Sequence, residues 1–115
     1  MTAKEIVLFC RPSYSPFTAL ARDLLIRYQI PFREVDIQAG SQAFASLITW
    51  VSPAHLPTLI VTAPNQTTPL DSPEPLQPDQ PARGLDRGSL ISQPNNHQLE
   101  DWLHKHGFLA KPYKR

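Results

Sequence analysis

The single cysteine, Cys10, is the first side chain whose chemistry could be catalytic. A cysteine attacks as a thiolate, so a reactive one needs a lowered pKa and access to solvent. Cys10 ends a run of apolar residues, and Arg11 is its only adjacent cation. We therefore expect a buried, inert thiol. One cysteine cannot form an intramolecular disulfide, which suits a reducing compartment.

Hydroxyl and imidazole groups raise a second possibility, because Ser15, Thr18 and His55 could together suggest a hydrolase. A serine nucleophile needs a histidine base that an acid orients, and many such serines lie in a Gly-x-Ser-x-Gly turn. The chain has no such turn, and no acid is placed to orient His55. We therefore do not expect hydrolase chemistry.

The other three histidines cluster near the C-terminus and invite a metal hypothesis. His104 and His106 are two residues apart, so they do not share a face of a helix. His97 and His104 are seven apart and could share one, but no cysteine or carboxylate completes a tetrahedral set. The sequence therefore predicts a solvated helix face and no metal site.

Seven elements must position these residues. Apolar runs without helical spacing predict four strands, at 5–10, 32–37, 58–61 and 89–91. Apolar residues with helical spacing predict three helices, from Pro16 to about Gln29, over 41–51, and from Asn95 or Asn96 to about Gly107. Ser15 is a suitable N-cap for the first helix, and Pro16 is a suitable first residue.

The order of these elements indicates the topology. A strand–helix–strand unit favours a right-handed crossover and a parallel pair, so the first two strands should be parallel. No helix separates the third and fourth strands, so these should pair antiparallel. The sequence predicts an α/β fold, a four-stranded mixed sheet with helices on both faces in the order βαβαββα.

Proline is over-represented, with 13 residues, and six of them lie between residues 62 and 88. Such a stretch cannot be a helix or a central strand, so we expect a long loop there. It is either a loosely draped linker or a lid over the segment that precedes the third strand. We expect one domain over residues 1–109, with this loop as an insertion, and a basic tail over 110–115.

Three segments together resemble the glutaredoxins. The run from Ile6 to Thr18 is similar to their first strand and active-site turn, where Cys-Pro-Tyr/Phe-Cys begins the first helix; here that tetrapeptide is Ser15-Pro16-Phe17-Thr18. Leu56-Pro57 resembles the segment that carries a cis proline before the third strand, and residues 30–37 resemble the second strand. The resemblance implies the thioredoxin fold.

The same resemblance implies that the ordinary reaction is lost. Glutaredoxins attack with a thiolate at the position of Ser15, and their dithiol members resolve the mixed disulfide with a cysteine at the position of Thr18. A serine hydroxyl is too weakly acidic to attack a disulfide. The chain should therefore be redox-inactive at this turn, in both the dithiol and the monothiol mode.

The resemblance therefore implies a binding site that lacks its nucleophile. Glutaredoxins bind glutathione through a basic residue before the turn, an aromatic wall, the cis-proline segment and the start of the last helix. The matching positions here are Arg11, Ser15, Phe17, Thr18, Leu56, Pro57 and Asn95. Residues 92–96, Ser-Gln-Pro-Asn-Asn, replace the family's Gly-Gly-x-Asp-Asp type of turn. We expect a ligand- or protein-binding module for a small thiol, a peptide or a protein, with glutathione as a candidate ligand.

Two enzymatic alternatives stay open. Cys10 could support thiol–disulfide exchange if its thiol were exposed and acidic. Ser15 could donate a hydrogen bond to the glutathione thiolate, as the catalytic serine of glutathione transferases does. Those enzymes add a large helical domain, for which 115 residues leave no room.

Charge and hydropathy exclude two classes of partner. Eleven Lys and Arg against ten Asp and Glu give a formal net charge of +1, without the concentrated basic face that nucleic acids require. No stretch approaches the roughly 18 consecutive apolar residues of a membrane-spanning helix. We expect a cytoplasmic protein that binds neither nucleic acid nor membrane.

Overall fold

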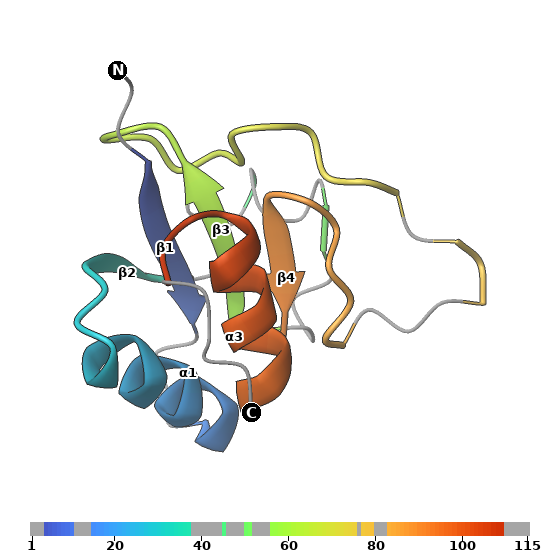
Figure 1. The fold of residues 1–115 in the computed structure, drawn as a ribbon. Coiled ribbons are helices and arrows are strands. Elements are labelled where there is room, and N and C mark those ends of the chain that lie inside the picture. Colours follow the sequence, from blue (N-terminus) through green and yellow to red (C-terminus); the bar gives the residue numbers. More distant parts are fainter. Residues whose placement is uncertain are drawn as a thin grey trace.

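A four-stranded mixed sheet with two helices forms the described part of the molecule (Figure 1). The computed structural model describes residues 4–10, 15–37, 45, 50–51, 56–75, 77–79 and 83–109. The elements are β1 (Glu5–Cys10), α1 (Pro16–Arg27), β2 (Phe32–Asp36), β3 (Thr58–Thr62), β4 (Leu90–Ser92) and α3 (Asn96–Lys105). None of the described helices has the length and apolar character needed to cross a membrane.

The strands lie in the order β2-β1-β3-β4. β1 and β2 are parallel, and β3 and β4 are antiparallel, as the sequence predicts. β3 is also antiparallel to β1, a pairing that the sequence did not predict. The predicted helix over 41–51 falls mostly on residues outside the described part of the chain. Two helices are therefore described where three are predicted. β4 begins one residue later than expected, at Leu90, and ends at Ser92.

Alternation along β1 produces two hydrophobic layers, because successive side chains of a strand point to opposite faces. Ile6 and Leu8 pack against α1 and α3, which lie on the same side of the sheet (Figure 1). Val7 and Phe9 pack on the other side, where Val51 and Leu56 contribute. Burial on both faces explains why the strand reads as a continuous apolar run. Packing on both faces fixes the position of β1 and therefore of its last residues, and α1 is the next element along the chain.

The first and last described parts of the proline-rich stretch both contact the sheet. Its first part leaves β3 and its last part returns beside β4 (Figure 1). Leu70 donates its N–H to the Val61 carbonyl at 2.7 Å. Arg83 and Asp86 form isolated bridges with Ser92 and Ile91 of β4. The described ends of this stretch are therefore docked on the sheet.

Arg87 fastens this stretch to the rest of the protein. Its side chain is buried, and it donates to the Glu74 carbonyl at 2.8 Å and to the Trp50 carbonyl at 2.7 Å. Its own carbonyl accepts the Glu74 N–H at 3.1 Å. Burial lowers the pKa of this guanidinium, and the carbonyl oxygens supply the hydrogen bonds that a buried cation needs.

Candidate functional site

Three chain segments meet at one end of the sheet. Because β3 is antiparallel to its two neighbours, the end of β1, the start of β3 and the end of β4 lie together, and Thr58 pairs with both Phe9 and Ser92. The Thr58 and Ser92 hydroxyls are hydrogen-bonded at 2.7 Å. α1 follows β1 and α3 follows β4, so both helices also begin here. We call this end the candidate site.

Ser15 occupies the N-cap position of α1, as predicted. Its backbone is extended (φ −142°, ψ 130°), and its carbonyl accepts the Ala19 N–H at 3.0 Å. Its side chain makes no capping hydrogen bond. Pro16 has no N–H, so Phe17 and Thr18 carry the first backbone donors of the helix, and these have no partner within the helix. The Ser15 hydroxyl is therefore not used to satisfy them.

Phe17 and Thr18 point in different directions. Thr18 is 6% exposed and belongs to the buried face of α1, so its side chain offers little surface to a ligand. Phe17 is 36% exposed, and the Arg83 guanidinium carbon lies 5.1 Å from the centre of its ring. Phe17 therefore keeps an exposed aromatic surface, and an arginine of the proline-rich stretch lies against it; its role as an aromatic wall for a ligand stays a prediction.

Leu56 and Pro57 are buried immediately before β3, and the bond between them is cis, as the resemblance implies. The Leu56 carbonyl accepts the Gln93 side-chain amide at 3.0 Å, and the Pro57 carbonyl accepts the Gln93 backbone N–H at 2.8 Å. One residue that follows β4 therefore holds both carbonyls of this segment.

Gln93 lies at the centre of the candidate site. Its φ of 45° is in the left-handed region, which costs a residue with a Cβ about 1 kcal/mol or more. Its side-chain oxygen accepts the Arg83 Nε–H at 3.3 Å, while its nitrogen donates to Leu56. A chain of contacts thus runs from Phe17 through Arg83 and Gln93 to Leu56. Non-glycine residues with left-handed backbone are concentrated at functional sites.

Asn95 starts α3 and caps it reciprocally. Its side chain accepts the Gln98 N–H at 2.7 Å, and its own N–H donates to the Gln98 side chain at 2.9 Å. Gly84 packs directly on this box: a Cβ there would lie 2.3 Å from the Gln98 side-chain oxygen, and its φ is +71°. The Asn95 side chain predicted to bind ligand therefore already has a partner within the helix.

Cys10 is buried, with 2% of its surface exposed, as expected for an inert thiol. Its Sγ lies 3.5 Å from Asp36 Oδ1, to which it donates. Burial raises the pKa of the Cys10 thiol to about 11, and the hydrogen bond to Asp36 acts in the same direction. The thiol is therefore protonated at neutral pH.

The remaining predicted residues fall into two groups. Arg11 and His55 lie outside the described residues. His97 Nε2 lies 3.5 Å from Asp101 Oδ2 on the exposed face of α3, and His106 Nε2 lies 2.8 Å from the Gly88 carbonyl. Within the described ranges, no three His, Cys, Asp or Glu side chains are grouped as metal ligands would be.

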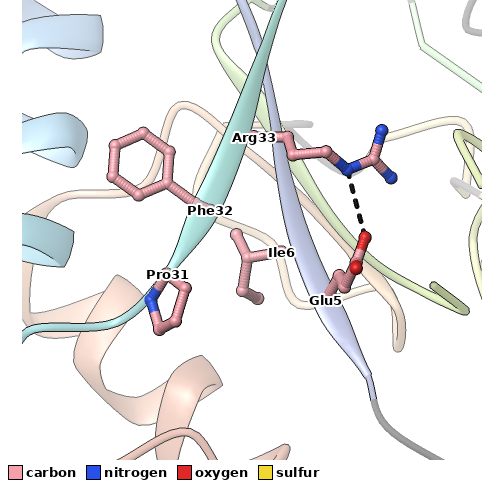
Figure 2. A pocket seen from close by; sticks show the side chains of 5 residues that line it. All are labelled: Glu5, Ile6, Pro31, Phe32 and Arg33. Atoms are coloured by element: carbon pink, nitrogen blue, oxygen red, sulfur yellow. Dashed lines mark hydrogen bonds and ion pairs between the residues drawn. The ribbon is translucent and has the colours of Figure 1, made fainter. Parts of the chain in front are cut away.

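A shallow pocket lies at the opposite end of the sheet, where β1 and β2 begin (Figure 2). It is lined by Glu5, Ile6, Pro31, Phe32 and Arg33. The Arg33 and Glu5 side chains point toward each other and form an ion pair at 3.1 Å (Figure 2). Arg33 also donates to the Gln66 carbonyl. The charged groups of this pocket are therefore paired with the protein itself.

The sequence did not single out Gln93 and Arg83, whose contacts lie at the centre of the candidate site. Both are polar residues in segments without a helical or strand pattern, and their contacts join chain segments far apart in the sequence. The one available signal is that Arg83 stands in a turn sequence, Arg83-Gly84, that closes the proline-rich stretch.

No model of a known protein family, no curated protein and no solved structure matches this chain.

Proposed function

We propose that this protein is a glutaredoxin-like member of the thioredoxin-fold superfamily that has lost thiol exchange and binds a small thiol or a peptide at the candidate site. The observation that carries the proposal is the contact chain Phe17–Arg83–Gln93–Leu56. This chain of contacts joins the start of α1, the segment before α3 and the cis-proline segment. The family resemblance assigns ligand binding to all three.

The loss of thiol exchange rests on the chemistry of three side chains. Ser15 supplies a hydroxyl where a thiolate is required, and Thr18 is buried and has no sulfur. Cys10 is buried and protonated at neutral pH, because burial raises the pKa of its thiol to about 11. A disulfide needs a thiolate as its attacking group, so no described side chain near the site provides one.

Binding rests on groups that a peptide can use. The first turn of α1 presents backbone N–H groups and the positive end of the helix dipole, which favour a carboxylate. Phe17 offers an aromatic surface. The Leu56 carbonyl accepts from Gln93 but, as a carbonyl oxygen, has a second lone pair for a ligand N–H.

Two measurements test the proposal. In a ¹⁵N NMR titration with S-methylglutathione, which cannot exchange disulfides, we expect shifts at Ser15, Phe17, Leu56 and Gln93. In a glutathione-dependent disulfide reduction assay, we expect the protein to match a Cys10→Ala control. Absence of any NMR shift would contradict binding, and reduction clearly above that control would contradict the loss of thiol exchange.

A further inference from the structure

Arg83 brings a positive charge from the proline-rich stretch to the candidate site. Its guanidinium lies over the Phe17 ring, and its Nε donates to Gln93. Gln93 is two residues before the Asn95 cap of α3, and Phe17 is in the first turn of α1. The guanidinium is therefore held between segments that begin the two helices.

The position of this charge is fixed by neighbouring backbone contacts. Arg83 forms a bridge with Ser92, and Gly84 donates its N–H to the Ser92 carbonyl at 2.6 Å. Three residues further on, Asp86 pairs with Lys105 of α3 at 2.7 Å. The side chain is exposed, but its backbone is docked on β4.

The charge of Arg83 is not neutralised by an acidic side chain. All ten Asp and Glu residues of the chain are described, and none lies within ion-pair distance of Arg83. By contrast, Arg22 and Arg33 pair with Glu34 and Glu5. An aromatic ring and an amide oxygen orient the guanidinium without cancelling its charge.

The donors that remain on Arg83 suit a carboxylate. Nε–H is used for Gln93, and no described residue accepts from the two terminal nitrogens. Those nitrogens carry four N–H groups in a planar arrangement that binds carboxylates through two hydrogen bonds. The nearby start of α1 adds positive potential.

We infer that Arg83 binds a carboxylate of the ligand and sets a preference for anionic peptides over neutral ones. This inference rests on the proposed function, because it names a charged group of the ligand for the same site. It also gives the proline-rich stretch a role: its last residues supply a binding cation.

The test compares the affinities of four proteins for S-methylglutathione by ¹⁵N NMR titration: the wild type, Arg83→Ala, Arg83→Lys and the control Arg27→Ala. Arg27 is an exposed arginine at the other end of α1. We expect Arg83→Ala to weaken binding about tenfold, the size expected for one charge-assisted hydrogen-bonded pair. Arg83→Lys should keep part of the affinity, and Arg27→Ala should keep all of it.

The same titration with the diethyl ester of S-methylglutathione tests whether the effect of Arg83 depends on the carboxylates of the ligand. This probe has no carboxylate and carries a single positive charge on its amino group, so Arg83→Ala should bind it at least as tightly as the wild type does. Wild-type binding of S-methylglutathione that Arg83→Ala leaves unchanged or strengthens would overturn the role of Arg83 and keep the proposed function. No binding by the wild type would overturn both.

Discussion

The two ends of the sheet each carry an arginine at the surface, and the two arginines have different partners. At the start of β1 and β2, Arg33 meets the Glu5 carboxylate and the Gln66 carbonyl. At the opposite end, Arg83 meets an aromatic ring and an amide oxygen. The charge of Arg33 is balanced by a carboxylate of the protein itself. A cation oriented by neutral groups keeps its full charge, which is the premise of the inference that Arg83 binds a carboxylate.

The difference also separates a pocket from a site. The pocket beside Arg33 is lined by residues of β1 and β2, but its two charged side chains are paired with each other (Figure 2). The candidate site instead combines a helix start, a left-handed Gln93 and the Arg83 guanidinium. Chemistry, and not shape alone, distinguishes the two ends.

The largest expected effect concerns thiols at the end of the sheet that holds the candidate site. With a pKa of about 11, only about one Cys10 thiol in 10,000 is ionised at pH 7. A Ser15→Cys variant in a Cys10→Ala background places a thiol at the start of α1, where helix N-termini lower thiol pKa values. We expect iodoacetamide to alkylate it at least about a hundredfold faster than Cys10 of the wild type.

Mass spectrometry of samples quenched over time gives both alkylation rates. Similar rates would mean that the start of α1 does not favour an anion, and the candidate site would lose the contribution of that helix start to its electrostatics. The Cys10→Ala protein, which has no thiol, is the blank.

The next effect is on stability and compares two glycines with positive φ. At Gly84 a Cβ would meet the Gln98 side chain, whereas at Gly107 (φ +83°) nothing lies within 4 Å. Gly107→Ala should lower the free energy of unfolding by about 1 kcal/mol, from backbone strain alone. Gly84→Ala should lower it by about 2 kcal/mol, because the end of the Gln98 side chain must move and would give up its hydrogen bond to the Asn95 N–H.

Urea denaturation measures both free energies of unfolding. Equal losses in the two variants would show that residues 83–84 do not pack on the capping box of α3, and the position of Arg83 would lose its support.

A third effect depends on pH. The native state holds the Cys10 proton up to a pKa of about 11, whereas an unfolded thiol loses it near 8.5. The contribution of Cys10 to stability is therefore complete below pH 8 and is lost as the pH rises from about 8.5 to 11. Relative to Cys10→Ala, the wild type should lose about 2 kcal/mol over that range.

Denaturation of both proteins in urea at pH 8 and pH 10.5 provides the comparison, in which lysine and tyrosine titrations common to both cancel. A difference that does not change with pH would contradict a buried, protonated Cys10.

The smallest effect tests the other end of the sheet. Arg33→Ala removes a half-exposed ion pair and should lower the free energy of unfolding by less than about 1 kcal/mol. Its affinity for S-methylglutathione should equal that of the wild type, since Arg33 lies at the opposite end from the candidate site. Weakened binding in Arg33→Ala would reverse the comparison.

Local patterns in the sequence were sufficient for most of the fold. The apolar run of β1, the Ser15–Pro16 helix start and the Leu56–Pro57 segment are all signalled by neighbouring residues, and the directions of the β1–β2 and β3–β4 pairs follow from element order. Ser15, Phe17 and Leu56 belong to those segments, and their part in binding stays a prediction.

The centre of the site was not predictable in this way. Gln93 adopts a backbone conformation that glutamine has no preference for, and it does so because two carbonyls before β3 accept its hydrogen bonds. Arg83 reaches Phe17 only because its segment docks on β4. Both depend on contacts between distant parts of the chain, which periodicity and turn propensity do not encode.

The most direct test of the account locates the bound ligand. Glutathione carrying a nitroxide on its sulfur broadens the NMR signals of amides near it. We predict the strongest broadening at Phe17, Gln93 and Asn95, and clearly weaker broadening at Glu5 and Arg33. Broadening at Glu5 and Arg33 that spares Phe17 and Gln93 would contradict the assignment of the binding site.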